Sequence, residues 1–500
     1  MKDEEKSGEW VTLCAQSELP PGNMRGFDVA GFPPVALFNV AGCVHATSNI
    51  CTHNVAILTD GSFDGRIVEC PLHGGSFDVT TGEAVSYPCE KGIEKFQVRV
   101  VDERISIARI GSAAGVETVE APPIPTPSPT PIPTPSPTSV PMSAGPALVE
   151  HVERQVEIRI EDSTHRFRCG PDDTLLRAAL RGDIGFPYEC NSGGCGSCTY
   201  RLVSGEMHDV WPDAPGLSVA ARARGTRLAC QSVPRSDCVI QVRERPEFIA
   251  PFKPSRHIVT LERITRLTRD MAVFHMRGDG MADFLPGQYA MLGVSNSADA
   301  ADAAGNSLER AYSMANTANG EGRWEFIVKE VAGGRFSSRI ASFVDIAGAL
   351  TLDGPYGNAY LRPDSTRPVL CIAGGAGLSP MLSILRGAVQ DERFADRPLS
   401  LFYGGRTPQD LCDALVLEAD EGLRDRVEWI NAISDGDAVD ETWGGRRGFI
   451  HEVVRAHFGK GLREHEIYLS GPPPMTDAVQ RMLVVEQRIP ASQIHFDRFC

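Results

Sequence analysis

Hydrophobic positions in the first part of the chain come in short runs that alternate with Gly, Asp and Asn. The runs cover 35–40, 66–69, 96–101 and 105–110. Runs of this length, bounded by turn residues, are typical of β-strands. No competing helical periodicity occurs there. The pattern therefore predicts a small all-β module at the N-terminal end.

The pattern changes after residue 150. Strand-like runs at 156–160 and around Phe167 lead into a helix-like segment at 174–181 and then a loop rich in Gly and Cys, which predicts an α+β module. A β-rich stretch follows from about 254 to 361. From 368 onward, strand-like runs at 369–373, 399–403, 427–430 and 466–469 alternate with helix-like segments. That alternation predicts a parallel α/β layer.

A proline-rich segment separates the first module from the others. It repeats the unit I-P-T-P-S-P-T, starting at Ile124 and again at Ile132. Alternate prolines favour polyproline II at about 3.1 Å per residue, which predicts a semi-rigid spacer of up to about 75 Å. We expect five segments: an all-β domain at 8–112, a linker at 113–149, an α+β domain at 150–246, a β-rich domain at 253–363 and an α/β domain at 364–500.

Composition narrows the function classes. The 500 residues hold 49 Lys+Arg and 65 Asp+Glu, a net charge of −16. Such a chain repels phosphate backbones and anionic lipid, so we expect neither nucleic acid nor membrane as a partner. The N-terminus shows no secretory signal, which favours a cytoplasmic location. Fourteen cysteines in a chain of this size indicate metal ligation rather than a disulfide framework.

The first metal constellation combines two Cys/His pairs. Cys51 and His53 are followed, after sixteen residues, by Cys70 and His73. Two thiolates for one iron and two imidazoles for the other are how a Rieske 2Fe-2S centre is held. The module resembles the soluble Rieske ferredoxins of ring-hydroxylating dioxygenases. A Cys2His2 zinc site is the alternative, although zinc fingers usually place a Cys pair before a His pair.

The remaining cysteines of this module have no place in the pattern. We expect Cys14, Cys43 and Cys89 to be small buried side chains rather than ligands.

The second metal constellation contains only cysteines. Cys190, Cys195, Cys198 and Cys230 match the C-x4-C-x2-C…C spacing of plant-type 2Fe-2S ferredoxins, which implies a β-grasp fold. Glycines within the loop allow backbone amides to approach the sulfurs. A structural four-cysteine zinc site remains open. We expect Cys169 and Cys238 to be packing residues.

Several motifs between 284 and 357 resemble the ferredoxin-NADP reductase superfamily, which implies an antiparallel β-barrel that binds FAD. In Arg310-Ala-Tyr312-Ser313, the resemblance implies that Tyr312 stacks on the flavin, Ser313 lies near its reactive nitrogen and Arg310 binds pyrophosphate. The loop with Gly333, Gly334 and Ser337 can offer backbone amides to a dinucleotide, which favours FAD over FMN.

The α/β module carries a nicotinamide-binding pattern. The strand from Val369 runs into a turn with Gly374, Gly375 and Gly377, and Ser470-Gly471 resembles the superfamily's nicotinamide-side loop.

One departure and two ambiguities accompany this pattern. The superfamily usually has cysteine where this chain has Ser470, so we expect slower hydride transfer. Asp410 as a ribose acceptor favours NADH, whereas Arg406 as a phosphate ligand favours NADPH, and we expect NADH. Phe499 is a candidate for packing on the flavin or simply for terminal packing.

Together the modules resemble the electron-transfer chain of Rieske non-haem iron ring-hydroxylating dioxygenases of the naphthalene-dioxygenase type, with ferredoxin and reductase fused. The resemblance implies a path from NADH through FAD and the plant-type cluster to the Rieske cluster. That last step is downhill by about 250 mV. No oxygenase site is discernible, so we expect a separate terminal oxygenase that meets the acidic Rieske module with a basic patch.

Three other functions remain possible from sequence. The chain could serve a di-iron monooxygenase of the toluene or phenol type. It could be a reductase for sugar deoxygenation, although the Rieske module argues against this. It could also be a redox sensor without enzymatic function, although four cofactor modules in electron-transfer order make this improbable.

Overall fold

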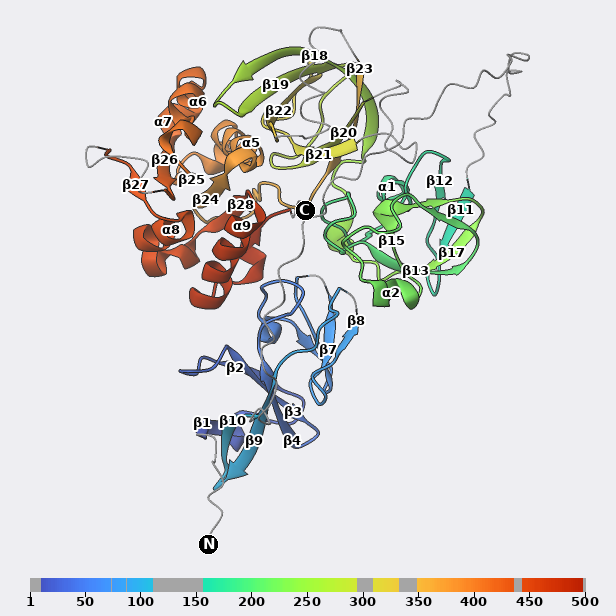
Figure 1. Ribbon diagram of the computed structural model, residues 1–500, viewed down its shortest axis with the longest axis vertical. Helices are drawn as coiled ribbons and strands as arrows, with labels where there is room; N and C mark the ends of the chain where they lie inside the picture. Colours follow the sequence, from blue (N-terminus) through green and yellow to red (C-terminus); the bar gives the residue numbers. More distant parts are fainter. Residues whose placement is uncertain are drawn as a thin grey trace, which may run out of the picture.

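The computed structural model describes residues 10–72, 74–86, 88–110, 156–294, 309–331, 349–435 and 443–497. The linker expected at 113–149 therefore lies outside the described residues. Four units surround a common centre in which residues near the C-terminus lie (Figure 1). The expected multidomain architecture is confirmed. None of the described helices is long and apolar enough to cross a bilayer.

The N-terminal unit is built of two antiparallel sheets, as the short alternating runs predict. The larger sheet has the order β1-β10-β9-β4-β3-β2, and the smaller has the order β5-β6-β7-β8. In Figure 1 the end of the unit that carries β7 and β8 is turned toward the other three units. The larger sheet consists of Val11–Ala15 (β1), Met24–Phe27 (β2), Val35–Val40 (β3), Cys43–Ser48 (β4), Lys95–Val101 (β9) and Arg104–Arg109 (β10), and the smaller of Ser62–Phe63 (β5), Ile67–Glu69 (β6), Ser76–Asp78 (β7) and Ala84–Ser86 (β8).

The second unit is a β-grasp in which helix α1 (Leu175–Arg181) packs on a mixed sheet. Thr174 caps the helix by accepting a hydrogen bond from the Arg177 backbone N–H at 3.4 Å. The sheet has the order β12-β11-β17-β13-β15, with β11 and β17 parallel. Its strands are Val156–Ile160 (β11), Arg166–Cys169 (β12), Thr199–Ser204 (β13), Thr226–Leu228 (β15) and Cys238–Gln241 (β17), while Met207–Asp209 (β14) pairs with Ser232–Pro234 (β16) and a short helix covers Val219–Ala223 (α2).

The third unit is the expected antiparallel barrel. Its six strands have the order β21-β20-β23-β18-β19-β22, and a bridge between Met314 and Phe326 joins the two outer strands and closes the barrel. The strands are Ser255–Arg266 (β18), Met271–Gly278 (β19), Tyr289–Val294 (β20), Glu309–Ser313 (β21), Arg323–Lys329 (β22) and Ala349–Tyr356 (β23).

The fourth unit is a parallel sheet with the order β27-β26-β25-β24-β28-β29, covered on both faces. Successive residues of its central strand point to opposite sides: Cys371 joins the core under α5, and Ile372 joins the core under α8 and α9. The strands are Val369–Gly374 (β24), Leu399–Gly405 (β25), Val427–Ile433 (β26), Arg446–Arg447 (β27), Glu466–Ser470 (β28) and Ile494–His495 (β29), and the helices are Leu378–Gln390 (α5), Asp413–Ala419 (α6), Glu421–Arg426 (α7), Ile450–Phe458 (α8) and Pro473–Gln480 (α9).

Two buried serines fasten helix α5 to the barrel. The Ser379 hydroxyl donates to the Ser313 carbonyl at 2.7 Å and accepts from the Ile327 N–H at 3.1 Å. Ser383 makes the equivalent pair of bonds, donating to the Asn316 carbonyl and accepting from the Gly287 N–H. The start of α5 therefore has a fixed position relative to the end of β21.

A buried ion network joins the β-grasp to the barrel. Asp353 on β23 accepts two hydrogen bonds from Arg181 at 2.6 and 2.7 Å, lies 3.5 Å from Arg177, and accepts from the Tyr356 hydroxyl at 2.9 Å. Arg177 also pairs with Glu309 at 2.8 Å. Burial opposes ionisation of Asp353, but the two arginines outweigh it and lower the pKa of Asp353. Both arginines come from α1, so this helix is held against the barrel by charge as well as packing.

Replacing Asp353 with Asn is expected to destabilise the protein by about 2 kcal/mol, because it removes the carboxylate that two largely buried guanidinium groups share and leaves Arg177 only Glu309 and Arg181 only Asp173 as acidic partners. Urea unfolding measures the change. Asp213→Asn is the matched control, since Asp213 is 94% exposed and lies 3.6 Å from Arg222. No measurable change is expected there. Equal effects of the two substitutions would contradict a structural role for the network.

Candidate functional site

The four cysteines of the plant-type pattern converge at one end of the β-grasp. All four are buried. Cys190, Cys195 and Cys198 lie on one loop, and Cys230 follows β15 in a short 3-10 turn. Backbone N–H groups of Ser192 and Cys195 point at the Cys190 sulfur at 3.4 Å. Such N–H···S bonds favour the thiolate, which is the form that binds iron.

The sulfurs interact in two pairs, Cys190 with Cys195 and Cys198 with Cys230. The bond from Cys195, helped by Ser192, lowers the pKa of Cys190 to about 5. Two thiolates for each of two irons is the ligation of a plant-type 2Fe-2S cluster. The residues present therefore fit this cluster, and the two-by-two arrangement does not favour a single tetrahedral zinc ion.

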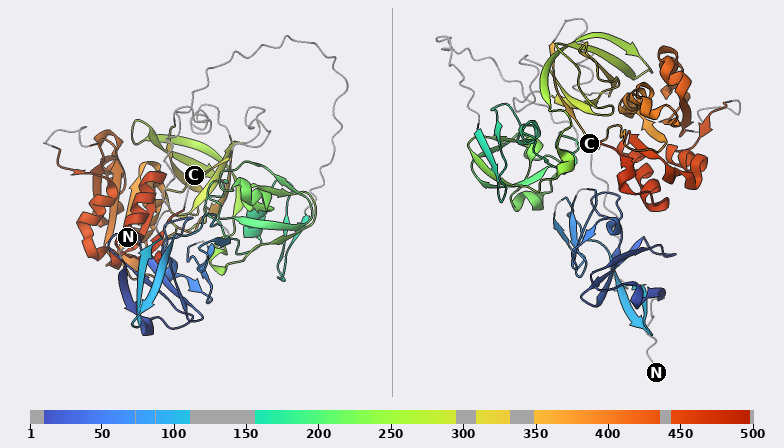
Figure 2. Two further views of the ribbon diagram at one scale, coloured as in Figure 1. Left: turned by 60° about the horizontal axis from the view of Figure 1, so that its bottom comes forward. Right: turned by 180° about the vertical axis from the view of Figure 1, so that it is seen from behind.

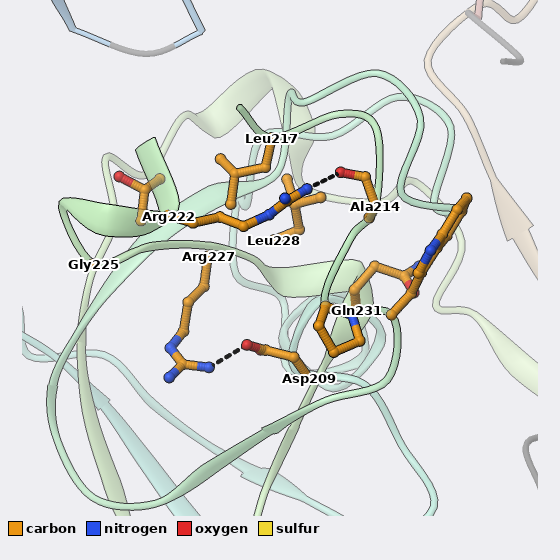
Figure 3. Close-up of a pocket in the computed structure, with 11 residues that line it drawn as sticks. Asp209, Ala214, Leu217, Arg222, Gly225, Arg227, Leu228 and Gln231 are labelled. Carbon is orange, nitrogen blue, oxygen red and sulfur yellow. Dashed lines mark hydrogen bonds and ion pairs between the residues drawn. The ribbon is translucent and has the colours of Figure 1, made fainter. Parts of the chain in front are cut away.

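Glycines are required where the cluster loop meets the segment before α2. Gly193 and Gly196 have φ of 86° and 83°, and a Cβ on Gly196 would lie 2.6 Å from the Gly216 carbonyl oxygen. Beside the turn that carries Cys230 is a hollow of about 200 Å³. Figure 3 shows Gln231 in its wall, and ion pairing of Asp209 with Arg227 across it. Cys230 itself is buried beside this hollow.

The Rieske ligands lie on the two loops at the tip of the smaller N-terminal sheet. Cys51 and Cys70 are buried, and their side chains interact with each other. His53 is half-buried, and His73 lies outside the described residues. A paired set of thiolates with an imidazole on the same loop fits a Rieske cluster, in which both thiolates bind one iron.

Of the other cysteines in this unit, Cys89 has a contact that the sequence did not indicate. Its sulfur lies 3.5 Å from the sulfur of Cys51. The Cys51 contact and burial raise the pKa of Cys89, so its thiol stays protonated and donates to the ligand sulfur. Cys14 is buried as expected, but Cys43 is exposed, so the expectation for Cys43 was wrong. Cys43 is the first residue of β4, directly after the tight turn at Ala41 and Gly42, where its side chain meets solvent.

The flavin-binding expectations fall on strand β21 and on a loop outside the described residues. Arg310 and Tyr312 are two residues apart and so share one face of β21. The Tyr312 ring packs against the barrel core yet stays partly exposed, which suits a stacking surface for an isoalloxazine. Ser313 ends the strand. The predicted pyrophosphate loop of Gly333, Gly334 and Ser337 lies outside the described residues.

The nicotinamide-binding expectations come together at the carboxyl ends of β24 and β28. A Cβ on Gly377 would lie 2.2 Å from the Ser470 carbonyl oxygen, and one on Gly471 would lie 3.2 Å from the Gly374 nitrogen. Gly375 has a φ of 54°. The crevice outside the carboxyl ends of parallel strands is where such sheets bind dinucleotides. The arrangement therefore fits a nicotinamide dinucleotide.

Asp410 has a role that the sequence did not reveal. One of its carboxylate oxygens accepts from the Arg406 N–H at 3.1 Å and from the Thr407 N–H at 2.9 Å, and the other lies 3.5 Å from Arg269. The carboxylate thus caps the turn after β25.

The cluster loop is tied directly to the flavin barrel. The buried Tyr289 hydroxyl donates to the Glu189 carbonyl, and the Tyr188 hydroxyl accepts from the Gly357 N–H at 2.9 Å. Tyr289 pairs with Ser313 in the β20–β21 ladder. The Tyr289 side chain therefore links the strand next to Ser313 with Glu189, the residue that precedes Cys190.

Near the C-terminus, Asp497 is a half-buried carboxyl that the sequence did not single out. It accepts from the Asn358 and Ala359 backbone N–H groups at 3.2 and 3.4 Å. Burial raises the pKa of Asp497 to about 7, and the two hydrogen bonds only partly offset it. Phe496 is partly buried against the core under α8 and α9, and Phe499 lies outside the described residues.

Cys89→Ala is expected to lower the reduction potential of the Rieske centre by about 45 mV. A hydrogen bond to a ligand sulfur stabilises the more negative, reduced cluster. Losing a bond worth about 1 kcal/mol therefore destabilises the reduced form by that amount, which for one electron is about 45 mV. A redox titration followed by EPR measures it. Cys89→Ser retains a donor and should keep most of the potential, and Cys14→Ala should not change it. An unshifted potential in Cys89→Ala would rule out the bond.

Asp497 predicts a pH dependence of stability. Its folded pKa is raised above the unfolded value, so the folded state binds more protons between about pH 4 and 7, and stability falls as pH rises through this window. Asp497→Asn should remove roughly 2–3 kcal/mol of that loss between pH 5 and 8. Urea unfolding at several pH values measures it. The exposed Asp396→Asn should leave the wild-type slope unchanged, and an identical slope in Asp497→Asn would contradict the prediction.

Comparison with known proteins agrees with this division. Four family models match: the Rieske [2Fe-2S] domain over residues 9–97, the 2Fe-2S iron-sulfur cluster binding domain over 158–235, the oxidoreductase FAD-binding domain over 258–360 and the oxidoreductase NAD-binding domain over 371–481.

Among curated relatives, the ferredoxin–NAD(P)(+) reductase CarAd of Metapseudomonas resinovorans is 43% identical over 332 residues, covering 66% of this chain and 96% of CarAd. The ferredoxin–NAD(+) reductase component of the alkene monooxygenase system of Xanthobacter autotrophicus is 37% identical over 343 residues, covering 68% and 100%. The solved structure of the ferredoxin reductase in carbazole 1,9a-dioxygenase matches with a TM-score of 0.62 and 39% identity, covering 70% of this chain and all of that one.

The structural match and the relatives cover about two thirds of this chain, and the Rieske model matches residues 9–97. The residues for both iron–sulfur clusters, FAD and a nicotinamide dinucleotide occur in a single polypeptide. The chain belongs to the ferredoxin–NAD(P)+ reductase family and carries a Rieske [2Fe-2S] domain ahead of its reductase domains.

Proposed function

We propose that the chain carries electrons from NADH, through FAD and the plant-type cluster, to its own Rieske centre and from there to a separate aromatic-ring-hydroxylating oxygenase. The observation that carries the proposal is the position of the Cys190–Cys198 loop. On one side its neighbour Glu189 accepts the Tyr289 hydroxyl from the flavin barrel, and on the other the Cys195 carbonyl meets His53 of the Rieske unit. The plant-type site thus lies between the other two.

The chain's residues divide the work of the flavin site. Tyr312 offers a ring face for stacking, Arg310 a charge for pyrophosphate, and Ser313 a hydroxyl at the strand end. Bound FAD supplies the conversion of a hydride's electron pair into single electrons. Ser379 bonds to the Ser313 carbonyl at 2.7 Å and thereby holds the nicotinamide turn beside the flavin strand. This positions the two reactants before reaction, so little orientation has to be gained afterwards.

Ser470 is buried at the end of β28, in contact distance of the Gly377 backbone. We expect it to face the nicotinamide, as the superfamily resemblance implies. NADH is the expected donor, supported by the relative described as a ferredoxin–NAD(+) reductase component. A cytoplasmic location stays a prediction from sequence.

The acceptor we favour is a ring-hydroxylating oxygenase, because one matching structure is titled as a ferredoxin reductase in carbazole 1,9a-dioxygenase. A di-iron monooxygenase is the second candidate, because a relative 37% identical to this chain serves an alkene monooxygenase system. Coupled turnover with a purified ring-hydroxylating oxygenase and with a purified di-iron hydroxylase distinguishes the two. The preferred partner should show faster turnover at a limiting reductase concentration.

Removing the middle centre tests the order of transfer. In Cys190→Ser, anaerobic mixing with NADH should still bleach the flavin, while the Rieske EPR signal should appear at least about tenfold more slowly than in wild type. In His73→Cys, the plant-type signal should develop normally and only the Rieske signal should be altered or lost. Freeze-quenched EPR alongside stopped-flow absorbance measures both. A Rieske signal that develops at the wild-type rate in Cys190→Ser would disprove the order.

A further inference from the structure

We propose that Arg243 and Arg245 dock the Rieske unit onto the β-grasp through Glu69, and that this docked arrangement is the one in which an electron crosses between the clusters. The inference deepens the proposed electron path and rests on it. One electron leaves the site of Cys190, Cys195, Cys198 and Cys230 and is taken up by the Rieske site, with no bond formed or broken. Docking supplies the contact, and release frees the same surface for the external acceptor.

The contact at the centre of this interface joins a ligand of one cluster to a ligand of the other. The His53 Nε2 atom lies 3.3 Å from the Cys195 carbonyl oxygen. A carbonyl can only accept, so Nε2 carries the proton and donates it. Nδ1 then holds the lone pair that can bind iron. A single hydrogen bond and the covalent bonds of Cys195 connect the two sites.

An ion-pair cluster lies beside this contact. Glu69 immediately precedes the ligand Cys70, and its carboxylate pairs with Arg245 at 3.0 Å and with Arg243. The Arg245 side chain is only 13% exposed and that of Glu69 22%. An ion pair as shielded as Glu69–Arg245 attracts more strongly than an exposed pair. Both side chains are nevertheless solvated when the Rieske unit and the β-grasp are apart. They suit an interface that forms and releases.

The Rieske loop is shaped to receive Arg245. A Cβ added to Gly74 would fall 1.8 Å from an Arg245 guanidinium nitrogen, so any side chain at this position would displace the arginine. Gly74 is the residue after the predicted ligand His73. The absence of a side chain there lets the guanidinium lie against the backbone of the ligand loop.

Two more contacts hold the same face of the Rieske unit. Glu90 accepts from the Ser218 backbone N–H at 3.3 Å, and Asp28 pairs with Arg488 of the α/β unit. In each ion pair the acid belongs to the Rieske unit and the arginine to the reductase. The views in Figure 2 likewise place the Rieske unit against the junction of the other units.

Docking covers the ligand loop from a second side. A hollow of about 520 Å³ is lined by Cys51 to Val55 on the Rieske side and by Gly471, Phe496 and Asp497 on the α/β side. Ile57 is buried in the core under α8 and α9. A loop enclosed in this way cannot meet a large external acceptor at the same time. Delivery therefore requires release of the Rieske unit from this docked arrangement.

Charge reversal on the reductase side tests the docking. In the double variant Arg243→Glu/Arg245→Glu of the full holoprotein, the Rieske EPR signal after anaerobic mixing with NADH should develop about tenfold more slowly or worse, because the pairs become repulsive. Flavin bleaching and the plant-type signal should keep wild-type rates. Small-angle X-ray scattering should show a larger radius of gyration, which reports release independently of electron transfer.

Restoring complementarity provides the second arm. Adding Glu69→Arg to the double variant should recover most of the rate and the compact scattering profile, provided that the EPR and absorbance spectra show an intact Rieske cluster. Arg235→Glu, which reverses the charge of one exposed arginine of the same unit, should change neither readout. Wild-type Rieske reduction in the double variant would overturn the docking proposal. If the Rieske signal never develops even in wild type, the proposed electron path fails instead.

Discussion

The hydrogen bond from Tyr289 to the Glu189 carbonyl fixes the plant-type cluster loop against the flavin barrel, and the rest of the relay depends on that placement. Tyr289 is fully buried and pairs with Ser313 in the barrel ladder, so its hydroxyl cannot move without disturbing the strand that carries the predicted flavin residues. A buried hydroxyl with one good acceptor is costly to displace. The loop, and every contact made beyond it, is therefore set by the barrel.

Arginine serves two different purposes at the interfaces of this protein. Arg177 and Arg181 are largely buried against Asp353, where separating the partners would strand charges in a poorly solvated place. Arg243 is largely exposed even beside Glu69, and part of what shields Arg245 is the Rieske loop at Gly74, so both arginines become more solvated when the Rieske unit leaves. The first pair of arginines suits a permanent joint and the second a reversible one. The same residue type thus separates a rigid reductase from a detachable Rieske unit.

The surroundings of each ligand set also differ. Backbone N–H groups point at both the Cys190 and the Cys51 sulfurs, and the Cys51 sulfur is also reached by the thiol of Cys89, which is not a predicted ligand. Backbone donors are fixed by the loop and cannot be changed by one substitution. A side-chain donor can be, so the Rieske potential is open to adjustment through a residue far from the ligand loops in sequence.

The sequence by itself determined that the chain carries Rieske, 2Fe-2S ferredoxin, FAD-binding and NAD-binding domains, and it predicted both ligand sets. The predicted cluster ligands lie on short loops, so their spacing in the sequence is the same however the domains pack. The strand at Val35–Val40 and the helix at Leu175–Arg181 follow from local periodicity and capping. Tertiary structure alone decided the roles of Cys89, Asp410 and Asp497 and the meeting of His53 with Cys195, which are 142 residues apart. Cys89 shows no local difference from Cys14 or Cys43. The contact of Cys89 with Cys51 depends on how the loops of one unit fold together, and that of His53 with Cys195 on how two units pack, and neither residue type nor spacing encodes such packing locally.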